Sequence, residues 1–455
     1  MIPVWLLIPF VVMLLCIAIL PMLPQVEHWW ENNLHKLYAS LILGVPVAVY
    51  LCLNGMGHDL EHQMLFDYIP FIILLGSLFV VTGGIHLSGD IAAKPWVNTL
   101  FLGIGYFLAS IMGTTGAAML LIRPVIETNK ERKHKMHTIL FFIAAVANCG
   151  GVLTPLGDPP LFLLYLKGAP FDWFMQLAPE WAFVGVCLLT VYYIWDSIMY
   201  KKESAEDIAL DNRIDKPLKI TGTLNFVYLI GIVLSVAFIN DSTISVMRDQ
   251  YDADGNLIAT APIWAKFLRE IMLTIIIILS WVTTSKKIRK DNKYSWGPIL
   301  EVAALFLGIF ATMTPALLYL KEHAASMGLT QPWQFMYCTG MLSSFLDNAP
   351  TALAFHSVAA GLPESLAFAA EGLGADGLYN GATFIAWIPE ILLKAISLGA
   401  VFFGAMTYIG NGPNFMVKAI AEENGIKMPS FFGYMFKFSL IVLLPIYIVT
   451  QLIFL

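Results

Sequence analysis

The sequence predicts an all-α integral membrane protein built from two inverted repeats. Three observations predict it: an apolar composition, long apolar segments separated by charged loops, and one motif that occurs in both halves. Of the 455 residues, 58% are hydrophobic and 13% are charged, and the mean hydropathy is +0.73. Soluble chains carry roughly 25% charged residues, so lipid must solvate much of this chain.

Composition also argues against several classes of protein. The net charge is -6, and no basic tract follows the pattern of a nucleic-acid site, so we expect no nucleic-acid partner. The five cysteines lie in apolar stretches without a CxxC pair, which disfavours a metal site or a disulfide framework. No nucleophile–base arrangement and no Walker sequence are visible, so we expect neither an enzyme nor a cofactor. The apolar N-terminus lacks a basic region and a cleavage site, which predicts a first membrane helix.

Apolar segments of roughly 20 residues predict membrane helices. The segments are 2–22, 37–54, 66–82, 97–127, 138–167, 178–199, 222–240, 263–284, 297–320, 333–361, 382–417 and 431–454. Segments 97–127 and 333–361 are too long for one span and break near their middle at small or helix-breaking residues. Segments 138–167 and 382–417 break at glycine and proline. Non-helical backbone at membrane depth needs protein or water around it.

The distribution of Lys and Arg predicts the orientation. Three loops are basic: 128–137, 200–219 and 285–293. Two loops lean acidic: 241–262 and 362–381. The three basic loops can all lie in the cytoplasm only if segments 97–127 and 333–361 are re-entrant hairpins. Each hairpin then enters and leaves the membrane on the same side. About ten full spans then remain, with both termini outside, in a multi-pass protein of the cell inner (plasma) membrane.

The two broken helices resemble each other. The motif TPLGDPPLF at 154–162 aligns with TYIGNGPNF at 407–415 at an offset of 253 residues, and Thr, Gly, Pro and Phe coincide. The hairpin breaks align near an offset of 233, with Thr115 opposite Asn348 and Ala118 opposite Thr351.

These alignments predict a domain organisation. The predicted units are a first inverted repeat at 1–200, a cytoplasmic linker at 201–221 and a second inverted repeat at 222–455. Inverted repeats with interrupted helices in matching positions indicate a secondary transporter whose substrate lies near the membrane midplane.

At these motifs the chain resembles the ion transporter superfamily, which contains sodium/proton antiporters of the NhaD type, arsenite permeases, and citrate and dicarboxylate carriers. The resemblance rests on SFLDNAPTA at 344–352, GVLTPLGDPP at 151–160 and TYIGNGPN at 407–414. It implies a homodimer in which each protomer has a scaffold domain and a moving transport domain. It also implies elevator-type alternating access, with sodium sites between each hairpin tip and the matching helix break.

Carried over position by position, the resemblance implies two ion sites. The first comprises Thr114, Thr115, Asn148, Thr154 and Asp158. The second comprises Asp347, Asn348, Thr351, Thr407 and Asn411. The expected sodium ligands among them are Thr115, Asn148, Asp158, Asp347, Asn348 and Asn411. The Ser-Asn-Thr hairpin signature of the dicarboxylate carriers is absent from the first hairpin, which disfavours a dicarboxylate substrate.

The residues themselves also point to these breaks. Asp158 and Asp347 lie at apparent membrane depth, where a carboxylate is costly unless it is paired or functional. Each could bind a cation and release protons when sodium binds, or could cap a broken helix, since Asp is a good N-cap. A group of four amides lies at the matched breaks, where Asn can satisfy freed backbone or bind a cation. The group is Asn148, Asn348, Asn411 and Asn414.

Other charged side chains have simpler interpretations. We expect Glu390 to pair with Lys394 one helical turn later. Glu301 starts a span near the cytoplasm and is interpreted as interfacial rather than as an ion ligand. Arg123 could pair with an anionic substrate, but snorkelling to the cytoplasm is favoured.

Three histidines are candidates for lesser roles. His356 could relay protons or pack as a hydrogen-bonded side chain, and the sequence leaves both open. His134 and His137 lie in a basic loop, where we expect water to solvate them.

Three functions follow from the sequence. The first is a sodium/proton antiporter, because two intramembrane aspartates and no fixed cationic residue at the breaks favour a cation as substrate. The alternative is a sodium-coupled carrier of citrate or another small organic anion. An ion channel is the third, and the lack of a continuous filter-like sequence argues against it. The expected partners are membrane lipid, the transported ion or organic anion, and a second copy of the chain.

Overall fold

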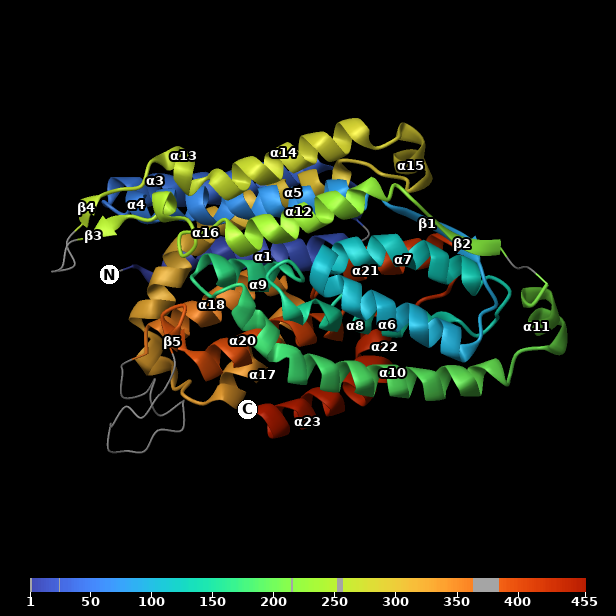
Figure 1. Cartoon of the computed structure of the whole chain (residues 1–455). Helices are drawn as coiled ribbons and strands as arrows, with labels where there is room; N and C mark the ends of the chain where they lie inside the picture. Colours follow the sequence, from blue (N-terminus) through green and yellow to red (C-terminus); the bar gives the residue numbers. More distant parts are fainter. Residues whose placement is uncertain (1, 24, 214–215, 252–256, 363–383) are drawn as a thin grey trace.

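The computed structural model describes residues 2–23, 25–213, 216–251, 257–362 and 384–455 (Figure 1). Helices account for most of these residues, and the strands are few and short. The predicted acidic loop 362–381 lies, apart from its first residue, outside the described residues.

The elements follow one another in three groups. The first group is α1 (Ile8–Ile19), α2 (Glu27–Trp30), α3 (Asn33–Leu53), α4 (Gly57–His62), α5 (Ile69–Thr82), β1 (His86–Asp90), α6 (Pro95–Met112), α7 (Thr114–Thr128), α8 (Met136–Ala145), α9 (Pro159–Leu166) and α10 (Ala178–Tyr200). The connecting group is α11 (Ala205–Asp211) and β2 (Lys216–Thr221). The last group is α12 (Leu224–Phe238), β3 (Gln250–Tyr251), β4 (Leu257–Ala259), α13 (Ile263–Lys266), α14 (Leu268–Thr283), α15 (Lys286–Asp291), α16 (Gly297–Glu322), α17 (Pro332–Phe345), α18 (Asn348–Ala360), β5 (Phe384–Ile385), β6 (Ile388–Pro389), α20 (Glu390–Phe403), α21 (Gly412–Glu423), α22 (Phe431–Tyr434) and α23 (Leu444–Phe454).

Short helical turns of other types extend or interrupt these helices. The 3₁₀ turns are η1 (Val4–Leu7), η2 (Leu20–Met22), η4 (Cys149–Leu153), η5 (Asp172–Leu177), η6 (Ser245–Met247), η7 (Ala324–Met327) and η8 (Gly404–Met406). The π-helical segments are η3 (Gln63–Tyr68) and η9 (Met435–Leu443).

Among the described residues, seven helical stretches are long and apolar enough to cross a membrane. They are Asn33–Leu53, Gly57–Thr82, Pro95–Met112, Met136–Leu153, Asp172–Tyr200, Gly297–Glu322 and Phe431–Phe454. Two shorter apolar helices are Val4–Ile19 and Leu224–Phe238. The prediction of a helical membrane protein is therefore confirmed.

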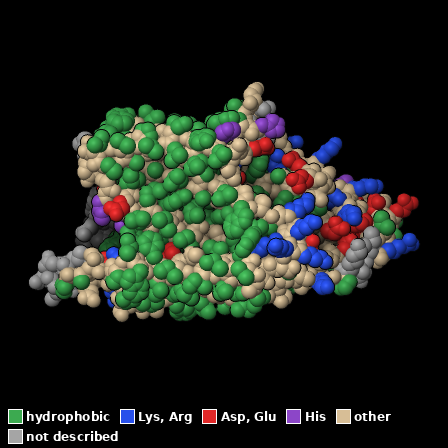
Figure 2. Space-filling model, turned by 90° about the horizontal axis from the view of Figure 1, so that it is seen from above, with side chains coloured by type: hydrophobic (Ala, Val, Ile, Leu, Met, Phe, Trp, Pro, Cys, Tyr) green, Lys and Arg blue, Asp and Glu red, His purple; other side chains and the backbone are tan. Residues whose placement is uncertain are grey.

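Charge and apolar surface separate along the molecule. Figure 2 shows Lys and Arg side chains gathered at one end, the end at which α11 and α15 lie in Figure 1. Apolar side chains cover most of the remaining face in that view. An apolar face of this kind is suited to contact with lipid tails, and the distribution of Lys and Arg predicts that the basic end faces the cytoplasm.

The helix breaks lie where small and helix-breaking residues predicted them. Helices α6 and α7 pack against each other and join at Gly113, whose φ of 80° and ψ of 150° favour glycine. Helices α17 and α18 form a second packed pair that joins at Leu346 and Asp347. Non-helical backbone and a short 3₁₀ turn separate α8 from α9, and the same arrangement separates α20 from α21.

The described residues contain three two-stranded sheets that were not predicted. Strand β1 follows α5 and pairs antiparallel with β2 of the linker, with His86 opposite Thr221. Strands β3 and β4 pair with each other, as do β5 and β6. The segment predicted to start a helix at 382 therefore begins its helix only at Glu390, because 384–389 contain β5 and β6. Two-stranded pairs this short depend on a partner strand and carry little local signal.

Helices α3 and α16 cross closely beside the site described below. The contact is made at Gly44 and Gly308, and a Cβ atom on Gly308 would lie 2.7 Å from the Cα of Ser40. Small residues of this kind let two membrane helices approach at backbone distance.

Replacing Gly308 with Ala should therefore lower the thermal stability of the detergent-solubilised protein. The added methyl group forces the two helices apart, and overpacking of this kind costs about 1–3 kcal/mol. Gly297→Ala in the same helix is the control, because its new Cβ would have Ser295 Oγ at 3.5 Å as its nearest neighbour. Equal melting temperatures for the two variants would show that the crossing tolerates separation.

Candidate functional site

The four helix breaks converge on one carboxylate, Asp158, which is 1% exposed. Its Oδ1 accepts hydrogen bonds from Thr114 Oγ1 at 2.7 Å and from Asn411 Nδ2 at 2.9 Å. Its Oδ2 accepts from Asn348 Nδ2 at 2.5 Å. The donors come from the starts of α7, α18 and α21, so both halves of the chain hold the same carboxylate. All three donors are neutral.

The two aspartates differ in their helix contacts. Asp158 occupies the N-cap position of α9, but its side chain makes no cap hydrogen bond, so the capping interpretation is wrong for it. The reason is local, because Pro159 and Pro160 follow and have no N–H to donate. Asp347 does cap its helix, since its Oδ1 accepts from the N–H of Ala349 at 3.0 Å. Asp347 also lines a cavity.

A second layer of amides surrounds Asp158. Asn148 Nδ2 donates to Asn414 Oδ1 at 2.7 Å and to the carbonyl of Ile143 at 2.8 Å. Asn414 Nδ2 donates to the carbonyls of Gly404 and Thr407. These amides therefore satisfy backbone carbonyls that the helix breaks leave free, which was one of their two predicted roles.

One hydrogen-bond acceptor beside Asp158 has no donor in the part of the chain that the structure describes. The Oδ1 of Asn348 is buried and has no hydrogen-bond partner among the described residues. A buried unpartnered acceptor beside a carboxylate adds a free oxygen to the site.

The predicted threonines have other partners. Thr154 and Thr407 donate through Oγ1 to the carbonyls of Ser110 and Ser344, respectively. Thr351 Oγ1 donates to the carbonyl of Asp347 at 2.9 Å, which stabilises the start of α18. These three threonines therefore hold backbone and do not contact Asp158.

Sequence reasoning missed Ser110 and Ser344. Ser110 Oγ donates to the carbonyl of Gly150 at 2.5 Å, and Ser344 Oγ donates to the carbonyl of Phe403 at 3.2 Å. Each serine thus binds a hairpin to the break beside it. Their signal in the sequence was their position just before each hairpin break, at nearly the same offset as the breaks themselves.

A cavity of about 410 Å³ borders the site. One wall contains Thr115, Asp347, Asn411 and Gly412, so Thr115 and Asp347 face open space. The opposite wall comes from α1, α3, α5 and the first turns of α16. The cavity therefore separates the helix breaks from a second group of helices.

Few charged side chains line this cavity. Within the described part of the chain they are Glu31, Lys36, Glu301 and Asp347. Lys36 Nζ lies 2.5 Å from Glu301 Oε1, and the Lys36 side chain is 5% exposed while that of Glu301 is 42% exposed. Glu301 therefore has a fixed cationic partner near the basic end, whereas Asp158 has none among its hydrogen-bond donors.

The expected pair of Glu390 and Lys394 is wrong. Glu390 Oε1 accepts from Trp173 Nε1 at 2.8 Å, and Lys394 Nζ lies 2.7 Å from Glu180 Oε1. Glu180 is 1% exposed on α10 whereas Glu390 is only partly buried, and a fully buried carboxylate is costly without a cationic partner. A contact from a distant helix thus replaced the local pair.

The histidine predictions have mixed outcomes. His356 is buried, and its Nε2 lies 2.8 Å from the carbonyl of Ala386, which is the packing role that the sequence left open. His134 is exposed, as expected. The expectation is wrong for His137, which is 4% exposed and whose Nε2 lies 2.7 Å from Asp196 Oδ1. His137 lies in the first turn of α8, on the side that packs against α10.

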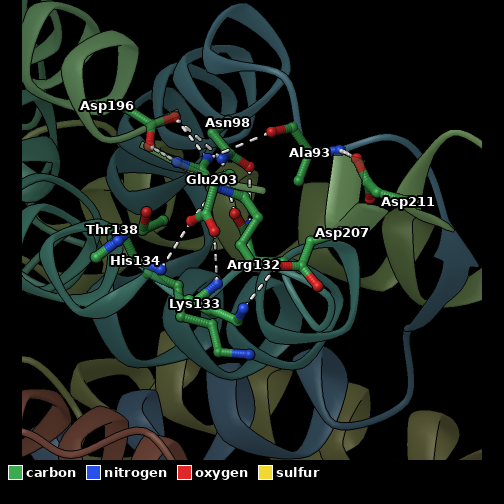
Figure 3. A network of polar contacts seen from close by, with 12 residues as sticks. Ala93, Asn98, Arg132, Lys133, His134, Thr138, Asp196, Glu203, Asp207 and Asp211 are labelled. Carbon is green, nitrogen blue, oxygen red and sulfur yellow. Dashed lines mark hydrogen bonds and ion pairs between the residues drawn. The ribbon is translucent and has the colours of Figure 1, made fainter. Parts of the chain in front are cut away.

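Asp196, the partner of His137, belongs to a buried network that also contains Arg132 and Glu203 (Figure 3). Arg132 donates to both oxygens of Asp196, at 2.6 Å and 3.0 Å, and Asn98 donates to the same carboxylate. Glu203 accepts from the backbone N–H groups of the loop that contains Arg132. The network joins the start of α6, the loop after α7, the start of α8 and the end of α10.

The same network holds the linker. Asp211 at the end of α11 accepts from the N–H of Ala93 at 2.9 Å, and Asp207 lies 3.1 Å from Lys133 Nζ. The Ser204 hydroxyl and the Lys133 ammonium hold the pKa of Asp207 below its ordinary value. Asp207 is therefore charged at neutral pH, and the linker is attached to the first group of helices.

Comparisons with known proteins relate the sequence to one family and to several transporters. The sequence matches, over residues 1–455, a family described as "Putative citrate transport". It is 24% identical over 301 residues to an uncharacterized transporter of Methanocaldococcus jannaschii, an alignment that covers 62% of this chain and 64% of that protein. It is 29% identical over 133 residues to the inner membrane protein YbiR of Escherichia coli, covering 26% and 35%. An uncharacterized transporter of Mycobacterium tuberculosis is 23% identical over 418 residues, covering 87% and 88%. The chain thus spans less than two thirds of the length of the first two relatives.

The buried network yields a stability prediction. Arg132→Met should destabilise the protein by about 3–5 kcal/mol, because it leaves the buried Asp196 carboxylate without its cation. The double variant Arg132→Met with Asp196→Leu should recover part of that loss, since it removes the Asp196 charge but leaves the buried Glu203, whose Oε1 lies 3.7 Å from Arg132 Nε, without that cation. Thermal unfolding in detergent measures both effects.

Lys133→Met is the matched control. Its side chain is 70% exposed and pairs with Asp207 at the surface, so its melting temperature should match the wild type. An equal loss in Arg132→Met and Lys133→Met would contradict a special role for the buried pair.

Proposed function

Because the chain belongs to the family described as "Putative citrate transport" and is therefore a membrane transporter, we propose that it works as a sodium/proton antiporter. The observation that carries this proposal is the environment of Asp158. This carboxylate is buried, and its hydrogen-bond donors are the neutral groups of Thr114, Asn348 and Asn411.

A buried carboxylate without a cationic partner is costly to keep charged. A proton or a mobile cation removes that cost. Sodium is a hard cation that prefers oxygen ligands, and Asp158 and the unpartnered Oδ1 of Asn348 supply them. In this mechanism sodium binding displaces the proton from Asp158, and proton binding displaces sodium, so that the two ions compete for one group.

Matched contacts in the two halves support an inverted repeat with boundaries at 1–200 and 222–455. The Thr154–Ser110 contact in the first half has its counterpart in the Thr407–Ser344 contact in the second. Asp158 and Asn411 are equivalent in the repeat and hydrogen bond to each other. Equivalent residues touch where a pseudo-twofold axis passes between them, so the repeat proposal places the site on that axis.

The cavity supports alternating access of the elevator type. It lies between the breaks, which would belong to the moving transport domain, and helices α1, α3, α5 and α16, which would belong to the scaffold. Its wall includes the first turns of α3 and α16, toward the basic end, so this arrangement corresponds to a state open to the cytoplasm. A homodimer of about ten spans and two re-entrant hairpins per protomer, in the inner membrane, completes the proposal.

Exchange in proteoliposomes tests the antiporter directly. A sodium gradient should move protons in the opposite direction, without any organic anion, as read by a pH-sensitive dye in the lumen. Asp158→Asn and Asp347→Asn should each reduce exchange to the level of empty liposomes. Asp207→Asn, at a partly exposed carboxylate of the linker, is the control and should retain exchange. Full exchange in both site variants would remove the two aspartates from the mechanism.

A sodium-coupled carrier of citrate or another small organic anion is the second candidate. Two observations favour it: the family description, and a cavity of about 410 Å³, which is within the range of small-molecule sites and far larger than one sodium ion requires.

Uptake of radiolabelled citrate separates the two candidates. If the protein is a carrier, an inward sodium gradient should drive citrate into proteoliposomes, and replacing sodium with potassium should abolish uptake. Sodium-driven proton movement in the absence of citrate, with no citrate uptake, would instead leave the antiporter as the function.

A further inference from the structure

Polar contacts join α9 to the opposite group of helices at the end of the molecule away from the basic loops. Helix α9 follows the break that contains Asp158 and packs mainly on α18. The partners of its C-terminal end are η3, α12 and α14. Helix α14 runs between α13 at one end and α15 at the basic end (Figure 1). Its contact with α9 is made by Arg269, in its first turn.

The first contact is an ion pair. Lys167 is the C-cap residue of α9, and its Nζ lies 2.6 Å from Asp67 Oδ2. Asp67 is 2% exposed within the π-helical segment η3, which leads directly into α5. The Lys167 side chain is 23% exposed, so the pair lies at the edge of the packed interior.

The second contact is made by Tyr165, which lies two residues before Lys167. The Tyr165 hydroxyl donates to the carbonyl of Val236 at 2.8 Å and accepts from Arg269 Nη1 at 3.2 Å. The Arg269 guanidinium lies 5.4 Å from the centre of the Tyr165 ring and 5.7 Å from that of Phe162. Glu270 neutralises Arg269 at 2.6 Å.

These contacts and the cavity both lie between the same two groups of helices, but toward opposite ends of the molecule. The cavity lies between the two groups of helices and is lined by the starts of α3 and α16, whereas the contacts of Lys167 and Tyr165 join the groups at the ends of α9 and α12. One side of the boundary is therefore hollow, and the other is held by an ion pair and by hydrogen bonds.

We propose that Lys167 and Tyr165 are positioning residues that hold the transporter in its cytoplasm-open state by closing the external side. This inference rests on the proposed alternating-access function. When the transport domain moves, the Lys167–Asp67 pair and the Tyr165 contacts must separate, and water must replace them. Interactions made in one state only shift the equilibrium toward that state.

The pair has the properties that such a role requires. Asp67 is buried while paired, so the pair separates only when the surrounding surfaces also separate. A pair within a single rigid group could not act in this way. Lys266 and Asp249 form such a pair, 3.0 Å apart, within the segment that leads into α14 at the same end of the molecule.

Sided chemical labelling tests the proposal without any transported ion. Met416→Cys places a thiol on the cavity wall, and a membrane-impermeant maleimide then reports whether the cavity is open to the cytoplasm. Labelling is measured in inside-out and right-side-out vesicles. Mass spectrometry of the peptide that contains residue 416 keeps the native cysteines out of the measurement.

We expect labelling from the cytoplasmic side in the parent protein. The double variant Asp67→Asn with Lys167→Gln removes both charges together, so no unpaired charge stays buried, and it should slow that labelling by roughly fivefold or more. Tyr165→Phe should act in the same direction. The charge exchange Asp67→Lys with Lys167→Asp should restore fast labelling.

Two results would overturn the proposal. The first is unchanged cytoplasmic labelling in the double variant. The second is equally slow cytoplasmic labelling in Lys266→Gln. This variant breaks the Lys266–Asp249 pair, which lies within one group of helices. A merely structural role would lower the melting temperature and leave the labelling ratio of the two vesicle types unchanged. Because no transport is measured, loss of antiport activity alone cannot produce either outcome.

Discussion

The charge of Asp158 is the constraint on which the rest of the structure depends. A carboxylate in the middle of a membrane protein needs either a partner cation or an ion that comes and goes. The chain gives it hydrogen bonds from Thr114, Asn348 and Asn411, which orient the carboxylate without neutralising it. Because these donors come from three separate helix starts, the site can exist only where the breaks of both halves meet.

The need to hold broken helices together at membrane depth explains many of the polar residues and glycines near the breaks. Every free backbone group there needs a partner within the protein, and the side chains of Asn148, Asn414, Thr154 and Thr407 supply them. The packing is tight enough to require glycine at the break itself. A Cβ atom on Gly157 would lie 1.9 Å from the carbonyl oxygen of Gly151, so no other residue fits that turn.

Much of this arrangement was predictable from the sequence, because its signals are local. Apolar segments predicted the helices. Glycine, proline and polar residues within overlong segments predicted the breaks at Gly113 and before Asp158. The matched motifs also indicated which residues lie near one another. Contacts decided by the packing of distant helices were not predictable. Lys394 pairs with Glu180 rather than with Glu390, His137 turns inward to Asp196, and Asn348 and Asn411 bind the carboxylate of the other half. The two ion sites expected from the resemblance, one in each half, stay a prediction, and the structure shows that donors from both halves hydrogen bond to Asp158.

The central claim is that Asp158 binds a sodium ion in competition with a proton. Sodium-dependent thermal stabilisation of the purified protein tests it most directly, because a ligand that binds the folded state raises its melting temperature. The account predicts that sodium, but not the same concentration of a large organic cation, stabilises the wild type. It also predicts that lowering the pH weakens this effect and that Asp158→Asn abolishes it. Stabilisation by sodium that is the same at every pH and persists in Asp158→Asn would contradict the account.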